Sequence, residues 1–182
     1  MIEPYLPAED TFLLVDSLGR LDRVEKAAEV GCSLGYSTEA LLEKADEVVA
    51  TEIDIQALYE AADRLARHYS RLHLIQASCL TVFRAAPLFD LVVTNPPYLP
   101  DVDSHDTTVD GGPTGVEMSL AVLGEASQLL RPNGAILLIG STLSDLSTLM
   151  KRARGMGLEP EETGRIKLFF EELVCWLFRR SI

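Results

Sequence analysis

The chain has 182 residues, 47% of them apolar, and carries a formal net charge of −12 with a sequence pI near 4.6. This length and apolar content suit one domain with a substantial core. The negative charge disfavours nucleic acid as the main partner, and no apolar run approaches the roughly 20 residues of a membrane helix, so we expect a cytoplasmic protein without membrane contact.

Short apolar strands alternate with helical patterns along most of the chain, which predicts an α/β fold with a mostly parallel seven-stranded sheet and helices on both faces. The last two strands are joined by a turn too short for a helical crossover, so we expect that pair to be antiparallel. The helices are expected at residues 8–18, 37–44, 55–69, 115–130 and 143–154, and the strands at 27–30, 47–51, 72–75, 89–94, 135–139, 158–166 and 173–179.

The first helix follows Pro7 and carries Glu9 and Asp10 in its first turn, where acidic side chains are favourable. We treat residues 1–24 as a leader and residues 25–182 as the core of a single domain spanning 1–182. No internal repeat or linker-like segment divides the chain.

The next motif, residues 29–35, joins a predicted strand to a predicted helix, and Glu52 ends the following strand. Gly31 lets the backbone approach a ligand, and Glu52 suits a ribose diol, which is the geometry of a nucleotide-cofactor site. Glu29 would repel a pyrophosphate but suits a cationic ligand with an amino group. This favours S-adenosylmethionine over a nicotinamide cofactor. By itself, the motif fits an ordinary strand-to-helix turn equally well.

The most informative segment comes at the end of the fourth strand, where Asn95, Pro96, Pro97 and Tyr98 follow an apolar run. The prolines fix the backbone and donate no hydrogen bonds, so we expect a rigid loop with carbonyls available as acceptors. The Asn95 amide oxygen and the Pro96 carbonyl would hold the two hydrogens of a substrate amine or amide, and Tyr98 would form an aromatic wall. The sequence therefore predicts a clamp for a weakly nucleophilic nitrogen.

Residues 101–106 alternate oxygen-bearing side chains in the manner of a calcium loop, but they lack its glycine and distal glutamate. We expect no metal there and interpret the segment as an acidic cover over the substrate entrance. Cys32, Cys79 and Cys175 are far apart and form no paired motif, so they predict neither disulfides nor a zinc site. Residues 130–134 (LRPNG) are predicted to end a helix before the next strand begins.

Together these motifs resemble the class I S-adenosylmethionine-dependent methyltransferases, and specifically the HemK-like protein-glutamine methyltransferases of translation termination factors. The resemblance rests on residues 95–98 (NPPY) and on residues 5–14 (YLPAEDTFLL), which are similar to the leader of the short archaeal and eukaryotic branch. It implies a Rossmann-like fold whose leader packs on the cofactor site, with S-adenosylmethionine as cofactor and S-adenosylhomocysteine as product.

The resemblance also implies roles for individual residues. Asn95, Pro96 and Tyr98 would be catalytic, and Asn95, Pro97 and Tyr98 would bind substrate. Cofactor contacts are implied at Thr11, Glu29, Gly31, Glu52, Cys79, Leu80 and Asn95. Two positions depart from the family pattern, because Ser33 replaces its second glycine and Cys79 replaces an aspartate that meets the adenine amine; Ser78 or a backbone group would then supply the missing acceptor.

The resemblance implies a class 1 release factor as protein substrate, methylated on the glutamine of its Gly-Gly-Gln motif. It also implies a small zinc-binding activator subunit that pairs with residues 72–75, which would be an edge strand; the alternative is an edge shielded by its own helix. Three other functions stay open: amino methylation of adenine or guanine in nucleic acid, protein-lysine methylation, and a degenerate cofactor-binding scaffold subunit.

Overall fold

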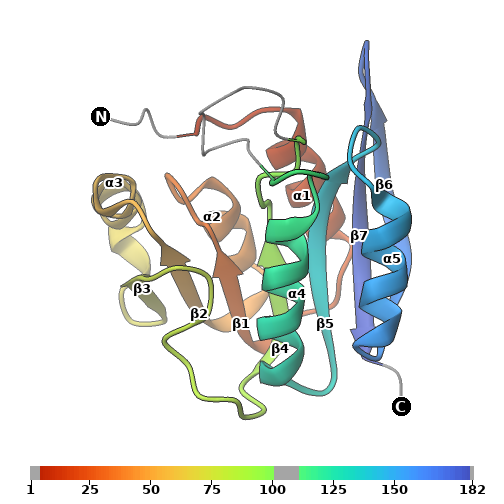
Figure 1. Ribbon diagram of the computed structural model, residues 1–182. Helices are drawn as coiled ribbons and strands as arrows, with labels where there is room; N and C mark the ends of the chain where they lie inside the picture. The colour runs from red at the N-terminus through yellow and green to blue at the C-terminus, as the bar shows by residue number, and fades with distance from the viewer. Residues whose placement is uncertain (1–4, 101–110, 181–182) are drawn as a thin grey trace.

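The computed structural model describes residues 5–100 and 111–180 and contains one seven-stranded sheet in the order β3-β2-β1-β4-β5-β7-β6 (Figure 1). The contacts among β1, β2, β3, β4 and β5 are parallel, whereas β7 runs antiparallel to both β5 and β6. This confirms the expected mixed sheet with an antiparallel closing pair. The strands are β1 (Val24–Val30), β2 (Ala45–Glu52), β3 (Leu72–Gln76), β4 (Phe89–Thr94), β5 (Leu130–Ser141), β6 (Leu158–Lys167) and β7 (Glu172–Arg180).

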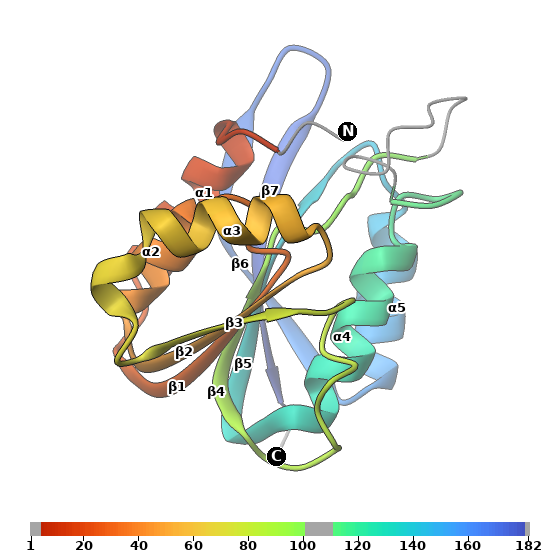
Figure 2. The same cartoon turned by 90° about the vertical axis from the view of Figure 1, so that its left-hand side faces the viewer.

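Helices cover both faces of the sheet (Figure 2). One face carries α1 (Glu9–Gly19), α2 (Tyr36–Leu42) and α3 (Ile55–Arg64), and the other carries α4 (Glu117–Leu129) and α5 (Leu146–Gly155). Successive side chains of a strand point to opposite faces. In β4, for example, Leu91 and Val93 join the core beneath the first set, while Val92 joins the core beneath the second.

Several boundaries differ from those expected, and three of the differences have a clear physical reason or consequence. The helix predicted over 55–69 ends at Arg64 and tightens into a short 3₁₀ turn (Ala66–His68), a common way for a helix to finish. The helix predicted over 143–154 starts at Leu146, because the Asp145 carboxylate caps it by accepting a hydrogen bond from the Thr148 N–H at 3.0 Å. Residues 130–134, expected to separate a helix from a strand, already belong to β5.

The order of the sheet reverses between β1 and β4, because the chain builds outward from β1 to β3 before returning to place β4 on the other side. Ligands of open α/β sheets bind outside the carboxyl ends of the strands at such a point. The Thr94 hydroxyl donates to the Val30 carbonyl at 3.2 Å and ties these two strand ends together. No helix within residues 5–100 and 111–180 has the length and apolar character needed to span a bilayer.

Candidate active site

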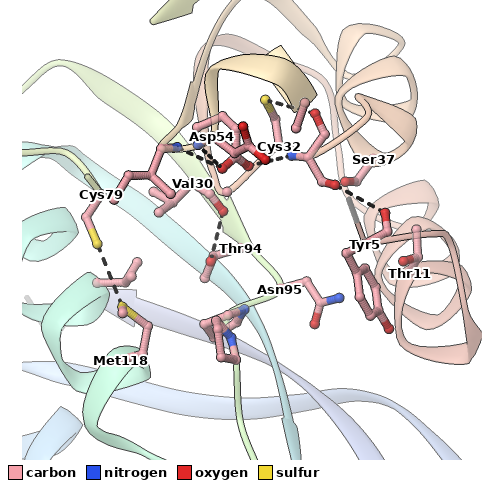
Figure 3. A pocket seen from close by; sticks show the side chains of 18 of the residues that line it. Tyr5, Thr11, Val30, Cys32, Ser37, Asp54, Cys79, Thr94, Asn95 and Met118 are labelled. Atoms are coloured by element: carbon pink, nitrogen blue, oxygen red, sulfur yellow. Dashed lines mark hydrogen bonds between the residues drawn. The ribbon is translucent and has the colours of Figure 1, made fainter. Parts of the chain in front are cut away.

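A cavity of about 300 Å³ opens at the carboxyl ends of β1, β2 and β4 (Figure 3). Its size falls at the lower end of the range for small-molecule and cofactor sites. The leader, the turn after β1, the end of β2, the segment after β3, the loop after β4 and helix α4 all contribute to the wall. The cavity therefore lies where the reversal of strand order predicts a ligand.

The turn after β1 forms the floor of the cavity. Gly31 has φ +73°, a left-handed conformation that only glycine adopts without strain. Ser33, which stands where the family pattern has a glycine, also has a positive φ of +45°. Its hydroxyl donates to the Tyr5 carbonyl at 3.1 Å, so the side chain holds the leader against this turn.

Glu52 ends β2 and lines the same cavity. One carboxylate oxygen accepts from the Ser33 N–H at 2.8 Å, and the other accepts from the N–H groups of Ile53 and Asp54 at 2.7 and 3.0 Å. These bonds fix the carboxylate, and an ionised carboxylate has about four acceptor positions in all. Glu52 thus retains capacity for a hydroxyl of a bound ligand.

Glu29 lies behind the cavity wall, outside the set of lining residues, with 1% of its surface exposed. Its two carboxylate oxygens accept hydrogen bonds from the hydroxyls of Ser37 and Thr38 in the first turn of α2. Burial raises the pKa of Glu29 to about 7, although the hydrogen bonds from Ser37 and Thr38 lower it. A direct cofactor contact at Glu29 stays a prediction.

Cys79 lines the cavity after β3, with φ +49° and its Sγ 3.9 Å from the Met118 sulfur of α4. Ser78, named as a substitute acceptor, lines the cavity as well. Leu80 does not: its side chain is buried in the core, and its N–H donates to the Glu125 carboxylate at 2.8 Å. The contact implied for Leu80 therefore stays a prediction too.

Asn95 stands at the end of β4 and lines the cavity (Figure 3). Its side-chain oxygen Oδ1 is buried and accepts no hydrogen bond. Among residues 5–100 and 111–180, only the Ser17 hydroxyl shares that condition. A buried acceptor without a donor costs roughly 1–3 kcal/mol, so such a group calls for an explanation. The Asn95 side chain lines the cavity, and a rotation of its amide that turns the oxygen toward the cavity would let a ligand N–H supply the missing donor.

The leader is fastened to the loop after β4 through Asp10, which is 3% exposed. One Asp10 oxygen accepts from the hydroxyls of Tyr5 and Tyr98 at 2.7 and 2.9 Å, and the other accepts from the Thr11 N–H at 2.6 Å. Burial, with Asp10 next in effect, raises the pKa of Tyr98, so it stays a neutral donor. We call Tyr5, Asp10 and Tyr98 the leader clamp.

Most of the predicted site residues converge on the cavity, although they come from distant parts of the sequence. Those that line it are Thr11, Gly31, Glu52, Cys79, Asn95, Pro96, Pro97 and Tyr98. Sequence reasoning missed the site role of Asp10, which it assigned only to a helix first turn. The available signal was its place in the leader motif five residues after Tyr5. The acidic segment 101–106 lies outside the described residues.

Comparisons with known proteins agree with this geometry. Residues 9–169 match the family described as methyltransferase small domain. The chain belongs to this family. It is therefore a methyltransferase, and the predicted family and fold class are confirmed.

Two curated relatives and one solved structure are especially similar to this methyltransferase. A putative protein N5-glutamine methyltransferase of Methanocaldococcus jannaschii is 28% identical, over 94% of this chain and 89% of the relative. A release factor glutamine methyltransferase of Moorella thermoacetica is 33% identical, over 90% of this chain but only 65% of that longer protein. The E. cuniculi Mtq2-Trm112 complex, described as responsible for methylation of the eRF1 translation termination factor, gives a TM-score of 0.78 at 25% identity, covering 97% of this chain and 98% of that one.

Proposed function

We propose that this methyltransferase transfers the methyl group of S-adenosylmethionine to the side-chain amide nitrogen of a glutamine, in the Gly-Gly-Gln motif of a class 1 release factor. The observation that carries the proposal is Asn95, whose side chain lines the cavity and whose Oδ1 has no hydrogen-bond donor within the described residues. A primary amide offers two N–H donors and is a poor nucleophile, so an enzyme that alkylates it has to hold and aim it. Asn95 supplies the acceptor for the first hydrogen.

The other residues of the loop, Pro96, Pro97 and Tyr98, support Asn95 in holding the substrate amide. Pro96 is buried and Pro97 partly buried, and the Tyr98 hydroxyl is held by Asp10, so the loop keeps its shape while substrate binds. Alignment of nitrogen with an incoming electrophile is worth roughly 7–11 kcal/mol in well-oriented reactions. As positive charge develops on the nitrogen, an acceptor fixed in advance at Asn95 stabilises it. We assign no general base, because the alkylated nitrogen is acidic enough to release its proton to water.

The cavity fits the proposed cofactor, which when bound supplies a methyl group on a positively charged sulfur. Gly31 allows the backbone to approach it, and Glu52 is fixed by three N–H groups with acceptor capacity left for a ribose hydroxyl. Ser78 and Cys79 lie on the wall of the cavity, where we place the adenine. Thr11 and Tyr5 close the cavity from the leader side (Figure 3).

The choice of protein over nucleic acid is supported by charge as well as by the relatives' names. The net charge is −12. The pKa of the Tyr5 hydroxyl is raised mainly by burial, and the negative charges of Asp10, Glu9 and Glu171 raise it further. Asp10, Glu52 and Asp54 line the cavity, and negative charge there repels a phosphate backbone. They favour a basic protein surface, and a release factor substrate would place the enzyme in the cytoplasm.

We also propose that a small activator subunit, binding zinc itself, adds a strand to β3. This strand is the outer one of the sheet, and its Leu74 and Ile75 are only partly buried. An open edge with apolar side chains is a surface for strand addition. The similarity to the Mtq2-Trm112 complex supports such a partner.

The test is transfer of labelled methyl from S-adenosylmethionine to a purified release factor, and to the same factor with its Gly-Gly-Gln glutamine replaced. Each reaction runs with and without a Trm112-like subunit. We expect label on the unaltered factor alone, and more of it with the subunit. Equal label on both factors would overturn the glutamine assignment, and label only on RNA or DNA would favour nucleobase methylation.

A further inference from the structure

The tip of the β6–β7 hairpin carries two adjacent phenylalanines whose side chains do not pack in the core. Phe169 is 90% exposed and Phe170 is 83% exposed, and they are the two most exposed large apolar side chains within the described residues. Their rings contact each other edge to face, with centroids 4.6 Å apart, which presents one continuous aromatic surface. We call this pair the aromatic tip.

Turn geometry does not explain these residues. The Leu168 N–H donates to the Glu171 carbonyl at 2.8 Å and closes a turn with Phe169 and Phe170 at its centre. Two-residue hairpin turns favour glycine, asparagine or aspartate, and neither phenylalanine is among the described residues with positive φ. A contiguous apolar surface that is exposed in this way is typical of interaction sites.

The aromatic tip lies at the carboxyl end of the parallel strands, the same end of the sheet as the active site. Leu173 of β7 pairs with Ser141 at the end of β5, so residues 168–171 extend beyond the carboxyl ends of the parallel strands. Figures 1 and 2 both show this hairpin rising past the sheet beside the leader. The tip thus projects on the side of the sheet onto which the cavity opens, although none of residues 168–171 lines the cavity.

Hydrogen bonds connect the tip to the NPPY loop. The Ser141 hydroxyl donates to the Glu171 carboxylate, and the Thr142 N–H donates to the Glu172 carbonyl at 3.0 Å. The Ser144 N–H donates to the Ser141 carbonyl at 3.1 Å, and its hydroxyl donates to the Tyr98 carbonyl. The hairpin base is therefore fixed relative to Tyr98.

From this geometry we infer that the aromatic tip is a docking element for the protein substrate, and that it inserts into an apolar hollow on a basic surface flanking the methylated glutamine. The inference rests on the proposed function and deepens it. Aromatic side chains that become buried at an interface often dominate its binding energy. The carboxylates of Glu9 and Glu171, which act on Tyr5 of the leader, complement basic residues around such a hollow.

The experiment compares the wild-type enzyme with a Phe169→Ser, Phe170→Ser double variant, with its activator subunit present throughout. Substrates are the intact release factor and a short Gly-Gly-Gln peptide that is too small to reach the tip. We expect KM for the intact factor to rise at least about tenfold, with kcat at saturation and kcat/KM for the peptide unchanged. Tyr59→Ala is the matched control, because Tyr59 is a 63% exposed aromatic residue on α3 that does not line the cavity.

A KM for the factor within about twofold of wild type would overturn the inference, as would an equal loss on factor and peptide, which indicates a structural role. A wild-type dimer in sedimentation that the double variant abolishes would also overturn it, because the tip would then be an interface between copies. Failure of the wild-type enzyme to label the factor is a distinct result. It refutes the proposed function and, with it, this docking role.

Discussion

At the scale of single residues, Asn95 is distinguished by a side-chain oxygen that has no hydrogen-bond donor. A buried amide oxygen without a donor destabilises the protein in the absence of ligand, and the same oxygen is useful only when an N–H group arrives. The unpartnered group therefore fits a role in binding or transition-state stabilisation better than a role in folding.

Replacing Asn95 with alanine should lower kcat by about 10²- to 10³-fold, the usual cost of removing one fixed hydrogen-bonding group at a reacting centre. Because the oxygen has no partner in the fold, the melting temperature should stay the same or rise. Single-turnover kinetics, thermal melting and calorimetry with S-adenosylmethionine measure these quantities. An equal loss of cofactor binding and turnover would refute the role assigned to Asn95.

Glu29 makes the stability depend on pH. Its pKa is about 7 in the folded state and 4.5 as a free side chain, so the folded protein keeps the proton to higher pH. The contribution of this proton to stability is complete below pH 4.5 and is lost as pH rises to 7. At about 1.4 kcal/mol per pKa unit, the loss is on the order of 3 kcal/mol.

Glu29→Gln removes this titration. The unfolding free energy of the variant minus that of the wild type should therefore increase between pH 4.5 and 7 and stay constant above that range. Urea unfolding at several pH values measures the difference. Glu60→Gln, at an exposed position on α3, is the control. A difference that does not vary over this range would show that Glu29 titrates normally.

At the scale of elements, α1 contacts β6 where that strand is irregular. The register of β6 on β7 shifts between Glu162 and Gly164, and α1 packs closely there. A Cβ on Gly164 would stand 2.8 Å from the Ser17 Oγ and 2.9 Å from a Leu13 methyl, both from buried side chains of α1. The absence of a side chain at Gly164 allows the leader helix to lie against the sheet.

Gly164→Ala should therefore destabilise the protein by about 1–3 kcal/mol, the usual cost of overpacking. Gly124→Ala is the matched control, because a Cβ there meets nothing within 4 Å in the middle of α4. That substitution should stabilise the protein by about 0.5–1 kcal/mol. Chemical denaturation compares the two. Equal effects would show that α1 moves freely enough to accommodate the methyl group.

The leader clamp shows the same dependence on distant contacts. Tyr5 and Tyr98 are far apart in the sequence, yet both donate to one buried Asp10 carboxylate. Through it, the leader and the NPPY loop hold one another in place, and the cavity between them takes its shape. The leader thus forms part of the site as well as packing on the sheet.

At the scale of the whole molecule, the net charge of −12 predicts that electrostatic attraction speeds association with a basic protein substrate. A basic protein is attracted over a distance that salt shortens, since the screening length falls from above 10 Å to a few ångströms between dilute and concentrated salt. The value of kcat/KM for the release factor should fall several-fold between about 50 and 500 mM salt, mainly through slower association. Steady-state kinetics at fixed pH measures it, with kcat at saturation as the control. A rise in kcat/KM with salt would contradict this electrostatic attraction.

Much of the fold was predictable because it depends on local patterns. The alternation of strands and helices, the short final turn and the apolar run before Asn95 each follow from the spacing of neighbouring residues, and the expected sheet was confirmed. Helix ends were less accurate. The start of α5 depends on the Asp145 cap, and the end of α3 depends on a 3₁₀ turn that periodicity does not reveal.

The sequence by itself determined the order of elements, the cofactor-type turn at Gly31 and the rigid loop at residues 95–98, since these depend on chain-local geometry. Only the tertiary structure decided that Asn95 Oδ1 lacks a partner, that Glu29 faces α2 from behind the cavity, and that Asp10 joins Tyr5 to Tyr98. It also placed the aromatic tip at the carboxyl end of the parallel strands, the end of the sheet that holds the cavity. The physical reason is that burial and hydrogen-bond partners depend on which strands become neighbours, and residue spacing alone does not encode that order.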